Sequence, residues 1–293
     1  MRDKHLFIFG LGFSGQALAR RVKGDYATIG GTVRHPEKSA QLRAEGIDAH
    51  VFDGETISDE LVAAVKRATH VIQSIAPGTA GDPVLGLLRE ALAGAPDLAW
   101  IGYLSTVGVY GDHGGGWVDE ATEPRPLSGR SIERVRAETE WRLLADELGV
   151  PIGIFRLSGI YGPGRNALAQ IVDGTARRLV KPGQVFNRIH VADIATVVAA
   201  GAAREAAGVF NVTDDEPAPP QDVVAFAAET AGYPAPPAID FETADLSPMV
   251  RSFYGENKRV GNKRLAADLG VRLAYPSYRE GIAALWKDGS WRG

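Results

Sequence analysis

The stretch that decides the fold is Gly10-Leu11-Gly12-Phe13-Ser14-Gly15, which lies between a predicted strand, His5–Phe9, and a predicted helix, Phe13–Val22. A GxGxxG pattern alone is a weak signal. Directly after a strand and at the start of a helix, it is characteristic of the loop that binds the pyrophosphate of a dinucleotide. The alternative is a glycine-rich turn that binds no ligand.

Each residue of this loop has a distinct expected role in cofactor binding. Gly10 allows the tight turn, Gly12 lets the backbone approach a pyrophosphate, and Gly15 lets the helix pack closely on the strand. Phe13 and Ser14 begin the helix, where free amides and the positive end of the helix dipole favour phosphate.

The first half of the chain alternates strand-like and helix-like segments, which predicts a parallel sheet with helices on both faces. The predicted strands are His5–Phe9, Ala27–Val33, Ala49–Phe52, Thr69–Ile75, Leu98–Ser105 and Pro151–Arg156. The predicted helices are Phe13–Val22, Pro36–Ala44, Asp59–Ala68, Pro83–Ala93 and Gly129–Leu148. We therefore expect an α/β fold with a Rossmann-type, doubly wound parallel sheet and a ligand site at the carboxyl ends of its strands.

After residue 156 the elements become shorter, and Pro and Gly become frequent. The predicted segments there are Asn166–Gly174, Val191–Arg204, Val209–Val212, Gln221–Ala231, Asn262–Leu269 and Tyr278–Trp286. We expect a dinucleotide-binding domain over residues 1–165. A smaller, partly intertwined C-terminal substrate lobe should cover residues 166–293.

The composition narrows the class of protein. The chain has 293 residues, a net charge of −4 and no Cys, so disulfides and thiolate chemistry are excluded. Without a basic excess, nucleic acid is not an expected partner. No apolar run is long enough to span a membrane, and the N-terminus leads directly into a strand. A cytoplasmic location is the simplest expectation.

The end of the second predicted strand indicates which dinucleotide binds. An NAD site usually has an Asp or Glu there, for the ribose 2′-hydroxyl. This chain has Arg34 instead, followed by Lys38, and a guanidinium suits a 2′-phosphate. We expect NADP rather than NAD, although Arg34 could also be a solvated loop residue. Asp53 ends the third strand, where it could meet the adenine or form an ordinary turn.

Five segments together carry a resemblance to a known family. They are Gly10–Gly15, Leu104–Gly111, Phe155–Gly164, His190–Ala195 and Phe210–Val212. In their order and spacing the chain resembles the short-chain dehydrogenase/reductase superfamily, in its extended and atypical branches. These branches include the NAD-dependent epimerase/dehydratase family. The resemblance covers nearly the whole chain and implies the same fold.

The resemblance also implies roles for individual residues. Thr106 would be the active-site hydroxyl that bonds a substrate carbonyl or hydroxyl group beside the nicotinamide. A strand-end hydroxyl satisfied by its own backbone is the alternative. Ser74 and Leu157 would contact the cofactor, and Ser105 would contact the substrate.

The chain departs from the family on one helix. The family's catalytic Tyr and Lys align with Arg130 and Arg134, which share a helix face. Arg130 cannot replace the Tyr as proton donor, because a guanidinium keeps its proton in proteins. Arg134 could still bond the nicotinamide ribose, with Glu138 as an ion-pair partner. We expect Arg130 to bind an anionic group of the substrate or cofactor; two solvated surface charges are the alternative.

Several other features are possible parts of the site. Tyr110 and Tyr161 are phenols expected near the cleft as substrate contacts, or as acids if their pKa is depressed. The glycine-rich loop 111–117 could be a lid or a plain surface loop. Tyr254 and Lys258 form a Tyr-x-x-x-Lys pattern far from the expected helix, which we interpret as coincidental. No arrangement of residues has metal-site spacing.

The basic cluster around Lys258 could attract an acidic substrate, or it could be a solvated face. Its members are Arg251, Lys258, Arg259, Lys263 and Arg264.

The sequence thus predicts an NADP-dependent oxidoreductase that acts on a small polar or anionic carbonyl or hydroxyl substrate, a sugar derivative included. The alternatives are a redox-silent NADP-binding sensor or scaffold, and an epimerase that holds its cofactor tightly. The resemblance adds a homodimer through the helices Pro83–Ala93 and Gly129–Leu148.

Overall fold

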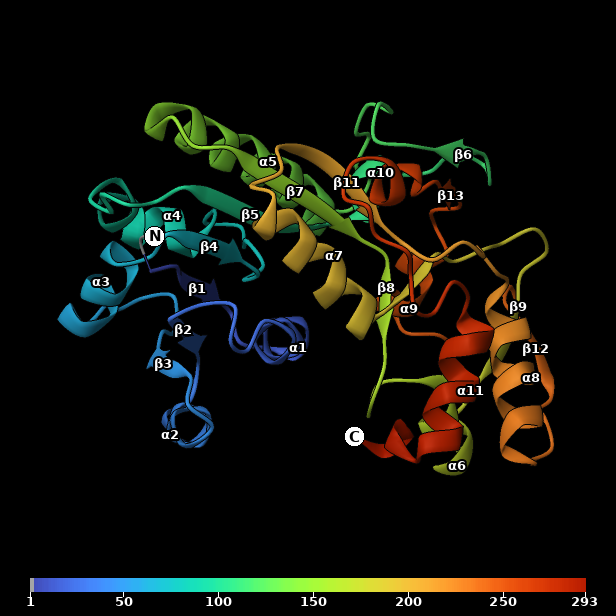
Figure 1. Cartoon of the computed structure of the whole chain (residues 1–293). Coiled ribbons are helices and arrows are strands. Elements are labelled where there is room, and N and C mark those ends of the chain that lie inside the picture. The colour runs from blue at the N-terminus through green and yellow to red at the C-terminus, as the bar shows by residue number, and fades with distance from the viewer. Residues whose placement is uncertain (1–2) are drawn as a thin grey trace.

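A computed structural model describes residues 3–293, and its centre is a seven-stranded parallel sheet (Figure 1). The strands run in the order β11-β7-β5-β4-β1-β2-β3. Their bounds are β1 His5–Phe9, β2 Thr28–Val33, β3 Asp48–Val51, β4 His70–Gln73, β5 Trp100–Thr106, β7 Ile152–Leu157 and β11 Gly208–Val212. The order reverses between β1 and β4, which is the switch point where doubly wound sheets bind ligands.

Helices cover both faces of the sheet, and each face has its own apolar core. They are α1 Phe13–Arg21, α2 Pro36–Ala44, α3 Asp59–Lys66, α4 Pro83–Ala93, α5 Gly129–Leu148 and α7 Val191–Ala203. Helices α1 and α7 pack side by side on one face, while α3, α4 and α5 cover the other (Figure 1). Strands β1 and β4 are buried along nearly their whole length, which explains the apolar run Leu6–Phe9 of β1 and the apolar centre, Val71 and Ile72, of β4.

The C-terminal lobe packs beside the carboxyl ends of the strands (Figure 1). Its helices are α6 Ala167–Val172, α8 Pro220–Ala231, α9 Pro248–Phe253, α10 Lys263–Ala267 and α11 Tyr278–Asp288. Short parallel pairs join β8 Gly159–Tyr161 to β10 Arg188–His190, β9 Arg178–Val180 to β12 Ala238–Asp240, and β6 Trp117–Val118 to β13 Arg259–Val260. Two short 3-10 helices are η1 Val107–Tyr110 and η2 Ser290–Arg292.

The predicted fold class is confirmed, and the sheet has one strand more than predicted. Strand β11, expected to belong to the lobe, pairs with β7 and extends the main sheet. Helix α7 likewise returns to pack on α1. The chain therefore enters the lobe and comes back, which local sequence patterns do not reveal. Within residues 3–293, no helix is both long and apolar enough to cross a bilayer.

The loop glycines yield a stability test. A Cβ at Gly15 would lie 2.4 Å from the Gly10 carbonyl oxygen, whereas a Cβ at Gly12 would meet nothing within 4 Å. Gly15→Ala should lose roughly 1–3 kcal/mol of unfolding free energy in urea titrations, because backbone must shift to admit the methyl group. Gly12→Ala, the matched control, should lose no more than about 1 kcal/mol. Equal stabilities of the two variants would contradict this packing.

Candidate functional site

Two cavities lie at the carboxyl edge of the sheet, and Ser74 lines both of them. The first, which we name the loop cavity, measures about 600 Å³ and includes Gly10, Gly12, Arg34 and Asp53 in its lining. The second, the central cavity, measures about 710 Å³ and lies between the sheet and the C-terminal lobe. It is lined by Ser14, Ser74, Leu104–Gly108, Arg134, Leu157–Tyr161, Arg165, Val185–Arg188, Val250, Phe253, Tyr254, Glu256 and Lys258.

The glycine loop leaves room on its cavity side. Gly10 adopts a φ of +91°, a left-handed conformation that favours glycine, and its amide donates to the buried Thr32 hydroxyl. Gly15 packs so closely on the Gly10 carbonyl that a side chain would not fit there, while the space around Gly12 is open. No side chain caps α1, so its first amides are available to an anion. Ser14, on the first turn, reaches the central cavity, while Phe13 contacts Gly162.

The residues predicted to select the cofactor line the loop cavity. Arg34 is exposed and forms no hydrogen bond or ion pair with the part of the chain described, and Lys38 lies beside it. The Asp53 carboxylate accepts from the amides of Glu55 and Thr56, which lowers its pKa. Asp53 therefore forms the turn that the sequence allowed, at the wall of the same cavity.

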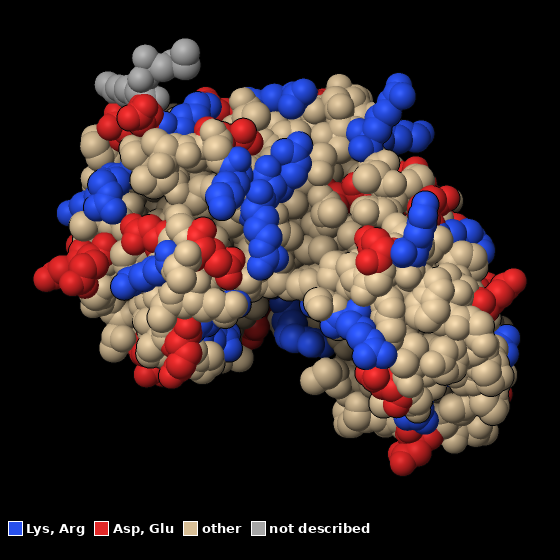
Figure 2. Space-filling view, turned by 60° about the horizontal axis from the view of Figure 1, so that its bottom comes forward, with Lys and Arg blue, Asp and Glu red and all other residues tan. Residues whose placement is uncertain are grey.

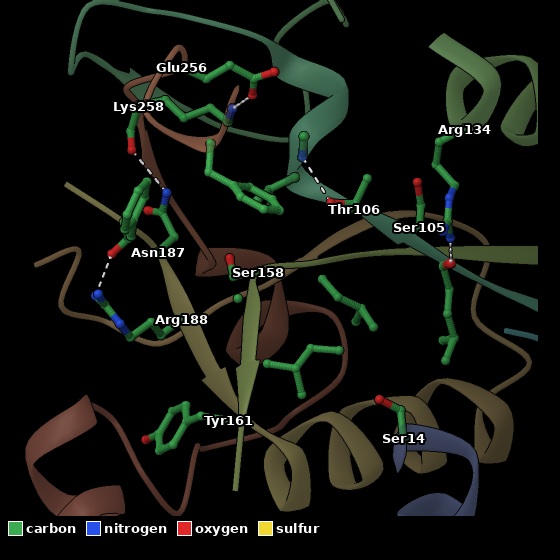
Figure 3. Close-up of a pocket in the computed structure, with 18 of the residues that line it drawn as sticks. Ser14, Ser105, Thr106, Arg134, Ser158, Tyr161, Asn187, Arg188, Glu256 and Lys258 are labelled. Carbon is green, nitrogen blue, oxygen red and sulfur yellow. Dashed lines mark hydrogen bonds and ion pairs between the residues drawn. The ribbon is translucent and has the colours of Figure 1, made fainter. Parts of the chain in front are cut away.

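Thr106, Ser105 and Arg134 come together in the central cavity (Figure 3). Thr106 ends β5, and its Oγ1 accepts from the amide of Gly108, which leaves the hydroxyl hydrogen free to donate. Arg134 donates to the Leu104 carbonyl over 2.6 Å, and its guanidinium lies 6.0 Å from the centroid of the Tyr103 ring. Sequence reasoning predicted that these three side chains share a site, and the structure places them in one.

A buried ion pair lies directly behind Ser105. Glu138 accepts from the Ser105 hydroxyl at 2.5 Å and from Arg156 at 3.1 and 2.7 Å. The Glu138 and Arg156 side chains are only 5% and 4% exposed. Glu138 thus pairs with Arg156 on β7, not with Arg134 as expected, because the Glu138 carboxylate points toward the sheet.

Arg130 lies at the rim of the central cavity. Its guanidinium stands over the Phe253 ring, 5.3 Å from the centroid, and Phe253 lines the cavity. The side chain is exposed, and Arg130 itself is absent from the lining. Arg130 and Arg134 share a helix face, but only Arg134 lines the central cavity. The Arg130 guanidinium instead packs on the ring of Phe253 on α9.

Of the two phenols expected near the cleft, only Tyr161 lines the central cavity. Tyr110 is fully buried outside the central cavity, because the turn of η1 directs it inward, where its hydroxyl donates to Asn211. Tyr161 lines the cavity, but its hydroxyl points away toward α11 and donates to the Ser277 carbonyl (Figure 3). Burial raises the pKa of both phenols, which opposes a role as acid.

Ser158 and Arg188, which sequence reasoning did not single out, also line the central cavity, as does Lys258 of the predicted basic cluster (Figure 3). The Ser158 hydroxyl is buried and has no partner in the described chain. Ser158 follows the predicted strand Pro151–Arg156. The expectation that ligands bind at the carboxyl ends of the strands could therefore have identified it. Arg188 pairs with Gly159 between strands β10 and β8. No local sequence pattern predicts this long-range pairing.

The Tyr-x-x-x-Lys pattern in the lobe also reaches the central cavity, since Tyr254 and Lys258 both line it. The Lys258 ammonium donates to the Gly111 carbonyl and to Glu256. Burial raises the pKa of Tyr254. The pattern lies in a loop after α9, so it does not form the helical pair of the family.

Loop 111–117 is held against the lobe. The amides of His113 and Gly115 donate to the Asn257 carbonyl, and β6 pairs with β13. No residue of the loop lines the central cavity, so the structure favours an anchored surface loop over a lid.

The basic cluster expected in the lobe is dispersed. Of Arg251, Lys258, Arg259, Lys263 and Arg264, only Lys258 lines the central cavity, and Arg264 pairs with Asp268.

The central cavity carries excess positive charge. Arg134, Arg165 and Arg188 line it without an ion pair in the described chain, whereas Lys258 is neutralised by Glu256. Figure 2 shows basic side chains beside the hollow between the two parts of the molecule. Within residues 3–293, no group of His, Cys, Asp or Glu could hold a metal ion. The cavity is therefore suited to an anionic organic ligand.

Comparison with known proteins shows which solved structures are similar to this one. No family model matches the chain. A conserved protein of unknown function from Silicibacter pomeroyi is 48% identical, with coverage of 98% and 99% of the two chains and a TM-score of 0.87. A putative NAD-dependent epimerase/dehydratase from Methylobacillus flagellatus is 27% identical over 99% of each chain, with a TM-score of 0.74. In fold the chain is similar to NAD-dependent epimerase/dehydratase proteins, which is consistent with an atypical short-chain dehydrogenase/reductase. The resemblance inferred from the sequence motifs is thus confirmed.

One curated relative is a reductase. The 3-diazoavenalumate denitrifying reductase from Streptomyces is 26% identical over 260 residues, which are 84% of this chain and 71% of the relative. More distant members of the same fold, under 25% identical, include an epimerase and a dehydratase whose structures hold NAD.

The buried ion pair yields a stability test. Glu138→Gln should lose roughly 3–5 kcal/mol of unfolding free energy, because it leaves the Arg156 charge buried without a counter-charge. Glu147→Gln is the matched control on the same helix. It removes an exposed ion pair with Arg89 and should cost at most about 1 kcal/mol. Urea unfolding of both variants measures the difference, and a Glu138→Gln variant as stable as the control would contradict the assigned role.

Proposed function

We propose that the protein is an NADP-dependent oxidoreductase that interconverts a carbonyl and a hydroxyl group on a small polar or anionic substrate. The observation that carries the proposal is the meeting of two cavities at Ser74. One contains the glycine loop and the unpaired Arg34, and the other contains Thr106 and unpaired arginines. The relatives named above include a reductase, which supports an enzyme of this class.

The residues present fit a dinucleotide phosphate. The open space at Gly12 and the uncapped start of α1 suit a pyrophosphate. Arg34 would hold the 2′-phosphate, because a guanidinium forms charge-assisted bonds with phosphate and Arg34 forms no ion pair in the described chain. Arg134 would bond the nicotinamide ribose at the central cavity.

When bound, the nicotinamide supplies or accepts the hydride. The chain itself orients the substrate. The Thr106 hydroxyl, free to donate, would hold the substrate oxygen, and Arg134 would add positive charge near the same point. Apolar side chains such as Leu104 and Leu157 limit water around the reacting group.

Replacement of Arg34 tests the cofactor assignment. Arg34→Ala should weaken NADP binding about 10- to 100-fold in calorimetric titrations, because charge-assisted bonds to the 2′-phosphate are lost. NAD binding should stay within about twofold, since NAD lacks that phosphate. Arg142→Ala, an exposed arginine on α5, is the control and should change neither affinity. An equal loss for both dinucleotides, or no loss, would remove Arg34 as the selecting residue.

Replacement of Thr106 tests the reaction assignment. In an NADPH-oxidation screen of carbonyl compounds, Thr106→Val should lower kcat/KM for the best substrate about 10²- to 10³-fold, because it removes a hydrogen-bond donor to the reacting oxygen. Thr106→Ser keeps the hydroxyl and should retain most of the activity. Full activity of Thr106→Val would overturn this role. Tight NADP binding without turnover in the wild type would favour a redox-silent binding protein instead.

A further inference from the structure

A third cavity, of about 350 Å³, lies in the C-terminal lobe behind the central cavity. It lies between β8, α6, α8 and α11, and the two cavities share Ile160, Tyr161, Arg165 and Arg188. The Tyr161 ring forms part of the wall between them, held in place by close contact with Gly281. We name this space the arginine cavity.

The arginine cavity carries positive charge without compensation. Arg165, Arg177 and Arg188 line it, and no Asp or Glu does so in the described chain. Arg177 and Arg188 donate only to backbone carbonyls, and none of the three forms an ion pair there. Asp214 acts on Arg188 only at longer range, and burial lowers the pKa of Arg188. Arg165 and Arg177 are exposed to solvent and Arg188 is partly buried, and three guanidinium groups around one small space favour binding of an anion among them.

A buried hydroxyl in the cavity also lacks a partner. Tyr278, at the start of α11, lines the cavity and is only 1% exposed. Its hydroxyl has no hydrogen-bond partner in residues 3–293. Buried polar atoms are nearly always satisfied, so an unpaired hydroxyl beside three arginines indicates a missing acceptor. An anion with several oxygens would satisfy both kinds of donor.

We propose that the arginine cavity is a subsite for a phosphate or carboxylate group at the far end of the substrate. The rest of that substrate extends past Arg188 into the central cavity, where Phe186, Ile160 and Val185 form apolar walls. Arg188 lines both spaces and connects them. This deepens the proposed function and rests on it for the reacting group. The anion site itself requires only the contacts described above.

Binding of two probes tests the proposal without a known substrate. Inorganic phosphate and phenyl phosphate are titrated by calorimetry into protein saturated with NADP, and into cofactor-free protein. We expect both probes to bind in both states. Phenyl phosphate should bind at least about tenfold more tightly, because its ring can enter the apolar central cavity. Equal affinity of the two probes would show a site for free anions only and would overturn the substrate assignment.

Variants show where the probes bind. Arg165→Gln and Arg177→Gln change exposed side chains, so they should fold normally, and each should weaken phenyl phosphate binding roughly tenfold. Tyr278→Phe should weaken binding severalfold without lowering the unfolding temperature, since the hydroxyl has no partner in the described chain. Arg142→Gln is the control and should bind as the wild type does. Unchanged binding in the Arg165, Arg177 and Tyr278 variants would overturn the subsite.

The same experiment separates failure of this proposal from failure of the proposed function. Arg34→Ala should lose NADP affinity and keep phenyl phosphate affinity. Loss of phenyl phosphate binding in Arg34→Ala would mean that the probe occupies the loop cavity, and the subsite would then be wrong. If the wild-type protein does not bind NADP, the cofactor assignment is wrong, but the proposed anion subsite is not affected.

Discussion

The site depends on one buried ion pair, between Glu138 on α5 and Arg156 on β7. A buried pair adds little net stability over an apolar contact, but neither partner can leave it without a large desolvation cost. The pair therefore fixes the position of α5 against the sheet. Because Arg134 lies one turn before Glu138, and Ser105 donates to Glu138 directly, the same interaction fixes both against the end of β5.

That constraint holds the face of α5 that carries Arg130 and Arg134, where the resemblance led us to expect the family's Tyr and Lys, against the end of β5. Arg134 occupies the inner position, where a cation can still contact a bound ribose, and it is held by the Leu104 carbonyl. Arg130 occupies the outer position and meets Phe253 at the rim. The helix thus brings positive charge to the central cavity through Arg134, and Arg188 adds positive charge from the lobe. We propose that this arrangement holds an anionic ligand beside the Thr106 hydroxyl.

Much of the sheet could be predicted from sequence, because its signals are local. The glycine loop, the apolar strands and the helix starts each depend on neighbouring residues, and β1, α2, α4 and α5 begin and end where predicted. Thr106 and Arg134 could be placed for the same reason: one ends a strand, and the other is counted along a helix. The resemblance supplied their expected roles.

The lobe side of the site could not be predicted, because it depends on contacts between distant segments. Arg188 meets Gly159 through a short parallel pair, and Lys258 reaches the cavity through bonds to Gly111 and Glu256. The inward turn of Tyr110 and the outward turn of the Tyr161 hydroxyl follow from packing in three dimensions. A single sequence shows that such residues are polar, but not which cavity they face.

The central claim is that the loop cavity and the central cavity form one dinucleotide site joined at Ser74. A crystal structure of the protein grown with NADP tests it most directly. The account predicts the 2′-phosphate at Arg34, the pyrophosphate against the glycine loop, and the nicotinamide beside Thr106 and Arg134. A nucleotide bound elsewhere, or bound with its nicotinamide outside the central cavity, would contradict the account.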